Sequence, residues 1–259
     1  MSEGVRVLVV EGSPRHRDEL LRALSGEKLS LCIQEPTEAL DLLERETFAL
    51  AVVGLRQTKT DPMILVRRAS ELGVPCLVTA AGFYDREARE ACQHGADSVW
   101  MYPLDVDRFL ARARALLEPV SPHPTVLLVE DNSDTRRAFR RTLEAAGFAV
   151  IEADRGVEGV RLALTRRLDA IVLDVNLPGL DGLAVCEILK GEPASTRLPI
   201  LMCTVRSGQE DQMGAVAAGA DAFLAKPFRP EELVAAVQKL IEERAPLRRQ
   251  EAFKPKRTT

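Results

Sequence analysis

Side chains that can bind a metal ion or react with a phosphoryl group follow several short apolar segments in the second half of the chain. They are Glu130, Asp131, Asp174, Thr204 and Lys226. If the apolar segments are parallel strands, these side chains meet at the carboxyl edge of one sheet. Three close carboxylates repel one another unless a cation lies between them. An all-oxygen set with few protein ligands suits Mg²⁺, so the pattern predicts a magnesium site.

A carboxylate beside such a metal can act as a nucleophile toward a phosphoryl group and form an aspartyl-phosphate. The metal and the Lys226 ammonium would neutralise the phosphoryl oxygens. The Thr204 hydroxyl could form a hydrogen bond to one of them. The residue types therefore predict phosphoryl chemistry at this edge.

Alternating strands and helices must position these groups. In the second half we expect strands at 125–129, 149–152, 170–174, 200–204 and 222–225, and helices at 133–146, 156–167, 182–190, 209–218 and 230–244. Ser133 is the expected N-cap of the first of these helices, and Gly147 follows its end. This alternation predicts a doubly wound, five-stranded parallel sheet of the flavodoxin-like type.

The chain repeats this pattern. Val7-Leu-Val-Val-Glu11 returns as Val126-Leu-Leu-Val-Glu130, and Gly95-Ala-Asp97 returns as Gly219-Ala-Asp221. A period this long indicates a duplicated domain rather than a solenoid. We expect two tandem α/β domains, at 1–118 and 125–244, joined by a proline-rich linker at 119–124. A basic tail at 245–259 is expected to be disordered.

The second copy resembles the receiver domain of two-component response regulators of the chemotaxis-regulator type. The matching stretches are Val-Leu-Leu-Val-Glu-Asp-Asn, Asp174-Val-Asn-Leu-Pro-Gly-Leu-Asp-Gly182, Thr204, and Gly219-Ala-Asp-Ala-Phe-Leu-Ala-Lys-Pro-Phe228. The resemblance implies that Asp174 is the phosphoacceptor and that Thr204 and Lys226 contact the phosphoryl group. It implies a Mg²⁺ site made by Glu130, Asp131, Asp174 and the backbone carbonyl of Asn176.

Two further positions have roles that the resemblance implies. Phe223 matches the aromatic switch position, whose rotamer follows Thr204 in the family. Val205 stands where the family usually has a small side chain, and it borders the entry to the acceptor. We expect Val205 to slow the approach of both phosphodonor and water. The Lys226–Pro227 bond matches a family position that is often cis.

The first copy lacks these groups. Gly12, Gly54 and Tyr102 stand where the second copy has Asp131, Asp174 and Lys226. Ala80 aligns with Thr204, although Thr79 is adjacent. We therefore expect a degenerate receiver, or pseudo-receiver, that binds a partner or the other domain. In the alternative interpretation the alignment fails around 54–61 and Asp61 is an unorthodox acceptor, although Asp61 before Pro62 is typical of a helix cap.

The composition sets the expected location and partners. The net charge is −4, from 35 basic and 39 acidic residues, and this balance argues against a nucleic-acid partner. No apolar run is long enough to span a bilayer, and the first residues do not resemble a signal peptide. The five cysteines form no CxxC pair, which is typical of a reducing compartment. We expect a cytoplasmic protein that does not bind membranes.

The predicted function is that of a response regulator, not an enzyme beyond its own phosphorylation and dephosphorylation. A histidine kinase or phosphotransfer protein would donate the phosphoryl group to Asp174, and a downstream protein or a homodimer contact would provide the output. With only 15 residues after the second copy, we expect no DNA-binding or enzymatic output domain. The alternative is a phosphatase of the haloacid-dehalogenase type, which would need a carboxylate where Asn176 stands.

Overall fold

The computed structural model describes residues 5–27, 29–55, 61–81, 85–119, 121–192, 195–204, 214 and 216–244. These residues fall into two compact units, 1–118 and 119–259. The expected helix at 209–218 and the expected tail at 245–259 lie wholly or largely outside the described residues, and so does residue 120 of the expected linker.

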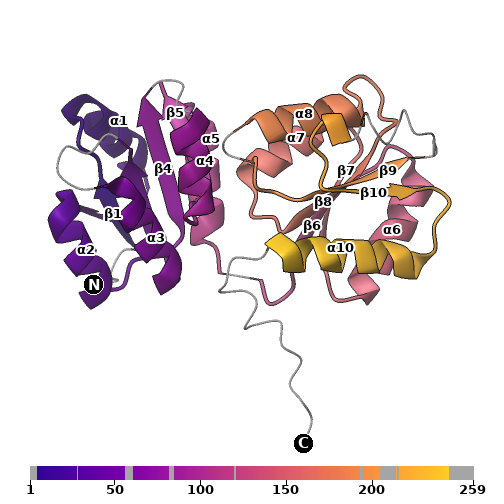
Figure 1. Cartoon of the computed structure of the whole chain (residues 1–259), viewed down its shortest axis with the longest axis horizontal. Helices are drawn as coiled ribbons and strands as arrows, with labels where there is room; N and C mark the ends of the chain where they lie inside the picture. Colours follow the sequence, from indigo (N-terminus) through magenta and orange to yellow (C-terminus); the bar gives the residue numbers. More distant parts are fainter. Residues whose placement is uncertain are drawn as a thin grey trace, which may run out of the picture. The chain divides into compact units, whose positions relative to one another are not determined.

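The first unit alternates strands and helices along the chain (Figure 1). They are β1 (Val5–Val10), α1 (Pro14–Leu24), β2 (Leu29–Ile33), α2 (Pro36–Arg45), β3 (Leu50–Gly54), α3 (Pro62–Leu72), β4 (Cys76–Ala81), α4 (Asp85–Gln93), β5 (Ser98–Tyr102) and α5 (Val106–Leu117). The strands pair in parallel in the order β2-β1-β3-β4-β5.

The second unit repeats the arrangement. Its elements are β6 (Thr125–Val129), α6 (Ser133–Ala145), β7 (Ala149–Ala153), α7 (Gly156–Thr165), β8 (Ala170–Asp174), α8 (Gly182–Gly191), β9 (Ile200–Thr204), β10 (Ala222–Ala225) and α10 (Pro230–Arg244). The strand order is β7-β6-β8-β9-β10, again all parallel. The predicted fold class, two tandem doubly wound five-stranded sheets, is confirmed.

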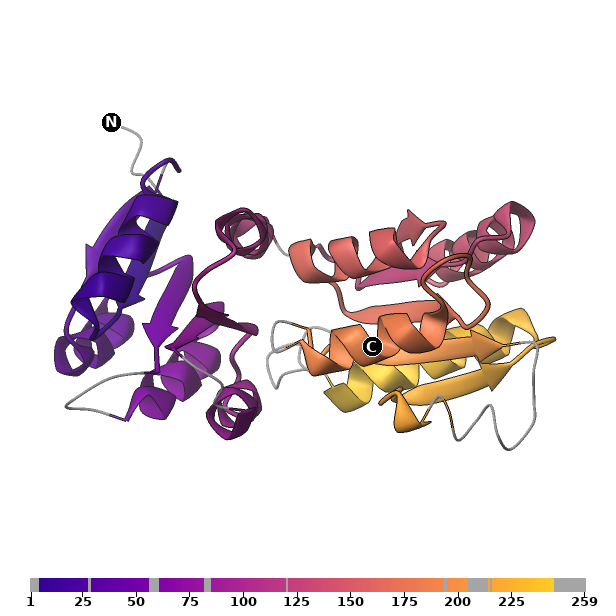
Figure 2. The same cartoon turned by 90° about the horizontal axis from the view of Figure 1, so that it is seen from above.

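Helices cover both faces of the second sheet. Figure 1 shows α7 and α8 on one side and α6 and α10 on the other, and Figure 2 shows the helices of each unit flanking its strands. Every residue of the central strand β8 is buried, as expected for a strand covered on both faces. The core on the α6 and α10 side contains Val126, Leu128, Leu143, Val172, Leu201, Leu233 and Val237. This packing fixes the strand ends that carry the polar groups.

The N-cap of α6 differs from the prediction. Asn132, not Ser133, is the cap: its side-chain oxygen accepts hydrogen bonds from the backbone N–H groups of Asp134 at 3.1 Å and Thr135 at 2.9 Å. Ser133 is the first residue of the helix itself. Asparagine and serine both favour the N-cap position, so the sequence alone could not show which of these two adjacent residues is the cap. Gly147 follows the helix with a φ of 90°, a left-handed conformation that suits glycine.

Candidate functional site

The acidic groups of the second unit lie at the ends of two neighbouring strands. Glu130 follows β6, and Asp174 is the last residue of β8, which pairs with β6. Both are buried, at 3% and 6% exposure, whereas Asp131 is exposed. One carboxylate oxygen from each of the three lies within 4.8 Å of the others. The sheet thus places two carboxylates inside the edge and one at its solvent side.

Lys226 brings a positive charge to these carboxylates. Its Nζ lies 2.6 Å from Glu130 Oε2 and 3.2 Å from Asp174 Oδ1. Burial lowers the pKa of Lys226, but its hydrogen bond to Glu130 and the charge of Asp174 outweigh this and raise the pKa. Burial raises the pKa of Glu130 in turn, and Lys226 opposes that shift. Lys226 therefore remains an ammonium group.

The backbone around Lys226 ties it to the neighbouring strand end. Its N–H donates to the carbonyl oxygen of Thr204 at 2.7 Å, and the Lys226–Pro227 bond is cis. The Nζ also lies 5.5 Å from the centre of the Phe139 ring, which packs against Phe228 at 5.1 Å. The Phe139 ring therefore makes a cation–π contact with the Lys226 ammonium.

The remaining predicted residues occupy the neighbouring strand ends and loops. Thr204 ends β9 and is buried at 1% exposure. Phe223, half-buried on β10, pairs with Met202 of β9. Asn176 is exposed in the loop two residues after Asp174. Val205 lies outside the described residues.

The loop after β8 folds back onto Asp174. A Cβ added at Gly182 would lie only 2.1 Å from the Asp174 carbonyl oxygen, so only glycine fits there. Gly182 also donates its N–H to the Val175 carbonyl at 2.9 Å, and Asp181 caps α8 through the N–H of Ala184 at 2.8 Å. The sequence motif from Asp174 to Gly182 includes this glycine, but the steric reason for it could not be predicted from the sequence.

The donor set fits Mg²⁺. Asp174 Oδ1 is buried and has no well-oriented hydrogen bond, although it faces the Lys226 ammonium. An oxygen of this kind can bind a cation without losing a well-oriented hydrogen bond. Together with Glu130 and Asp131 it provides hard oxygen ligands on one edge, and the exposed side leaves room for metal-bound water.

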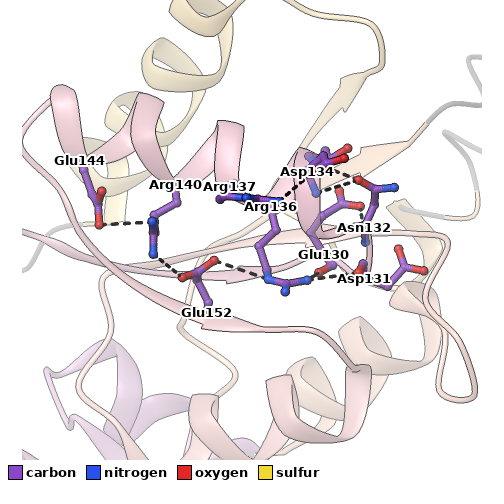
Figure 3. A network of polar contacts seen from close by, with 10 residues as sticks. Glu130, Asp131, Asn132, Asp134, Arg136, Arg137, Arg140, Glu144 and Glu152 are labelled. Atoms are coloured by element: carbon purple, nitrogen blue, oxygen red, sulfur yellow. Dashed lines mark hydrogen bonds and ion pairs between the residues drawn. The ribbon is translucent and has the colours of Figure 1, made fainter.

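An arginine outside the predicted set also contacts this edge. The guanidinium of Arg136 donates from Nη1 to the carbonyl oxygens of Glu130 at 2.7 Å and Asp131 at 3.1 Å (Figure 3). On its other side it pairs with Glu152. The only sequence signal for it is a basic residue five positions after Asp131, in the first turns of α6, and such residues are common on helix surfaces.

The corresponding edge of the first unit is built differently. Glu11 is buried, and a Cβ added at Gly54 would lie 2.3 Å from its Oε2. The Thr79 hydroxyl donates to the same oxygen at 3.1 Å. Tyr102 replaces the lysine and stacks on His16, with ring centres 3.9 Å apart. The Glu11 carboxylate therefore borders the space that an acceptor side chain at position 54 would need.

Asp61, the alternative acceptor, has a structural role. Its side chain caps α3 by accepting a hydrogen bond from the N–H of Met63 at 2.9 Å. That contact accounts for an aspartate before Pro62.

Comparison with known proteins agrees with this geometry. Residues 126–238 match the model of the response regulator receiver domain. Transcriptional regulatory protein PrrA of Mycobacterium tuberculosis is 41% identical over 121 residues, which are 47% of this chain and 51% of that protein. Response regulator MprA of Mycobacterium sp. is 40% identical over 121 residues, 47% of this chain and 52% of that protein. This chain spans about half the length of the curated relatives it matches.

Two solved structures are also similar to part of the chain. Chemotaxis protein CheY4 of Vibrio cholerae has a TM-score of 0.44 and 33% identity, and the match covers 46% of this chain and 98% of that one. The receiver domain of sensor histidine kinase PA1611 from Pseudomonas aeruginosa was solved with a magnesium ion in its active-site cleft. It also has a TM-score of 0.44 and 33% identity, over 46% of this chain and 98% of that one.

The second unit is therefore a response regulator receiver domain, and the recognition made from its strand-end motifs is confirmed. The family is one of phosphoacceptors in two-component signalling, with histidine kinases as donors and Mg²⁺ at the acidic site. No helix among the described residues is both long and apolar enough to cross a membrane.

One functional expectation is wrong. We expected a response regulator without a DNA-binding output domain, but similar curated proteins include PrrA, which is named as a transcriptional regulatory protein. The expectation was wrong because the type of output was inferred from the number of residues that follow the receiver domain. The phosphatase alternative has no support either, because the matched family is the receiver and Asn176 offers no second carboxylate.

Proposed function

We propose that Asp174 is the phosphoacceptor of this receiver domain. The observation that carries the proposal is the meeting of Asp174 with Glu130, Asp131 and Lys226 at one edge of the sheet. A buried carboxylate held beside an ammonium and an oxygen-ligand set is suited to attack a phosphoryl group.

The donor would be a phosphohistidine on a histidine kinase or a phosphotransfer protein. An Asp174 oxygen attacks phosphorus, a P–O bond forms, and the P–N bond breaks. The imidazole leaves with the bonding electron pair and takes a proton from water. Mg²⁺, held by Glu130, Asp131, Asp174 and the Asn176 carbonyl, would supply positive charge to the phosphoryl oxygens.

The other residues would act on the phosphoryl group once it is bound. The Lys226 ammonium would pair with one phosphoryl oxygen, and the Thr204 hydroxyl would donate a hydrogen bond to another. The Phe223 ring would follow Thr204 and change the surface formed by β10 and α10. A downstream protein or a second copy of the chain would respond to that change.

The first unit would not accept a phosphoryl group. Gly54 offers no nucleophile, Gly12 replaces the second acid of the metal pair, and Tyr102 offers no ammonium. These three absences in the sequence support its role as a pseudo-receiver.

Labelling with acetyl phosphate, followed on phosphate-affinity gels, tests the acceptor. The native chain should be modified with Mg²⁺ and not with EDTA, and Asp174→Asn should abolish the modification. Asp181→Asn is the matched control, because it makes the same change in the same loop and asparagine can still cap α8. Equal labelling of Asp174→Asn and the native chain would refute the proposal.

A further inference from the structure

Arg136 holds the backbone of the acidic pair rather than its carboxylates. Its Nη1 donates to the carbonyl oxygens of Glu130 and Asp131, the two residues that connect β6 to α6. Its carboxylate partner among the described ion pairs is Glu152. The arginine therefore restrains the backbone of Glu130 and Asp131 and leaves their carboxylates free to bind the metal.

The guanidinium is itself held in place from the neighbouring strand. Glu152 of β7 lies 3.5 Å from Arg136 Nε, and its other oxygen accepts a hydrogen bond from Arg140 at 3.0 Å (Figure 3). Arg140 also lies 3.8 Å from Glu144. Arg136 and Glu152 are both partly buried, so less of this contact is screened by water than in a fully exposed pair. The network fixes the planar fork before any ligand arrives.

The first unit offers a comparison within the same chain. Arg17 occupies the position that corresponds to Arg136, counted from the shared glutamate. The strand position that corresponds to Glu152 holds Ile33, as the pairing of Leu128 with Glu152 and of Val9 with Ile33 shows. The carboxylate that anchors the arginine is thus present in the unit that has both acidic residues and replaced in the unit that has Gly12.

We propose that Arg136 is a positioning residue for the magnesium site, with Glu152 as its anchor. This inference rests on the proposed function of Glu130 and Asp131 as metal ligands. By fixing two consecutive carbonyl groups, Arg136 restricts the backbone torsions that aim the two carboxylates. Outer contacts of this kind commonly change metal affinity about 10- to 100-fold when removed.

The sign of the effect separates positioning from simple electrostatics. A positive charge near a cation site repels the metal, so removing Arg136 should strengthen Mg²⁺ binding if charge alone matters. Positioning predicts the opposite, a weaker site after the loss of a cation. A purely structural role would lower the stability of the unit and leave the affinity of the folded protein unchanged.

The test is Mg²⁺ titration of the full chain by isothermal titration calorimetry, without phosphodonor. Arg136→Gln should weaken binding roughly 10-fold. Arg136→Lys keeps the charge but replaces the planar fork with a single ammonium, so it should also weaken binding. Arg137→Gln is the matched control: it removes the same charge one residue away, from an exposed side chain paired with Asp134, and should bind like the native chain.

The outcomes distinguish this inference from the function on which it rests. If the native chain does not bind Mg²⁺, the proposed metal site fails and the inference fails with it. If the native chain binds but both Arg136 variants bind equally well or more tightly, only the positioning role is overturned. Thermal unfolding of each variant, measured alongside, ensures that affinities are compared for folded protein.

Discussion

The first-strand glutamate has the same local contact in both units but a different charge environment. Glu11 accepts a hydrogen bond from the N–H of Ser13 at 2.9 Å, and Glu130 accepts one from the N–H of Asn132 at 3.3 Å. Glu130 also faces the Lys226 ammonium, whereas Glu11 faces the hydroxyl of Thr79. The shared contact preserves the turn after the strand, and the second contact decides whether the edge can serve phosphoryl chemistry.

This difference predicts a pH-dependent stability of the first unit. Burial raises the pKa of Glu11, and its hydrogen bonds from Ser13 and Thr79 oppose this shift only in part. The folded unit therefore binds the proton more tightly than the unfolded chain. The stability that protonated Glu11 contributes is fully present below the pKa of Glu11 in the unfolded chain. It is lost as the pH rises through the pKa of Glu11 in the folded unit. Glu11→Gln should therefore reduce the loss of stability that the native chain shows as the pH rises above the pKa of a glutamate in the unfolded chain.

Urea unfolding followed by tryptophan fluorescence measures this directly. Trp100 is the only tryptophan of the chain and is buried in the first unit, so its emission reports that unit. Glu44→Gln, at an exposed carboxylate, is the control and should retain the native pH profile. A profile of Glu11→Gln that matches the native one would show that Glu11 does not carry the dependence.

Val205 gives a second residue-scale prediction, although it lies outside the described residues. The resemblance to receiver domains implies that position 205 borders the acceptor. A stiff β-branched side chain there would hinder water from approaching phosphorus in line with Asp174. Val205→Ala should therefore speed loss of the phosphoryl group about fivefold, equivalent to about 1 kcal/mol. Mg²⁺ affinity should change little. An unchanged or longer half-life of the phosphorylated protein would exclude a gating role.

Much of the candidate site could be predicted from the sequence because each group follows a buried strand. Parallel strands end at one edge, so Glu130, Asp174 and Lys226 were expected to meet, and they do. Arg136 could not be predicted in this way. Its role depends on contacts with backbone carbonyls and with Glu152 on a neighbouring strand, and neither contact leaves a spacing pattern in the sequence.

At the scale of elements, strands were easier to predict than helix boundaries. The predicted strands 125–129, 170–174 and 200–204 match β6, β8 and β9, since apolar runs buried on both faces have sharp ends. Helix ends were less certain: α7 stops at Thr165 rather than 167. Caps depend on which of two adjacent polar side chains turns back on the backbone, as Asn132 and Ser133 show.

The cap of α6 can be tested by paired substitutions. Asn132→Ala should cost about 1 kcal/mol of unfolding free energy, because two backbone N–H groups lose their side-chain acceptor. Ser133→Ala should cost well under that, since Ser133 is not the cap. Urea unfolding by circular dichroism follows both units, and Trp100 fluorescence identifies the contribution of the first. An equal loss in both variants would contradict the assignment of Asn132.

At the scale of the whole molecule, duplication kept the fold and separated the chemistry. Both units have the same strand order, yet only the second has an aspartate at the end of its central strand. A repeated sequence pattern therefore predicted the fold of both halves, while the function of each half depends on a few strand-end residues. Chain length was a poor basis for predicting the output of the receiver, because a relative of the second unit is named as transcriptional regulatory protein PrrA.

The number of phosphoryl groups per chain tests the central claim most directly. Intact mass spectrometry after incubation with phosphoramidate and Mg²⁺ should show one added phosphoryl group on the native chain and none on Asp174→Asn. Substitutions of Glu11 or Asp61 should leave the single group in place. Two groups on the native chain, or one group retained by Asp174→Asn, would contradict an acceptor confined to the second unit at Asp174.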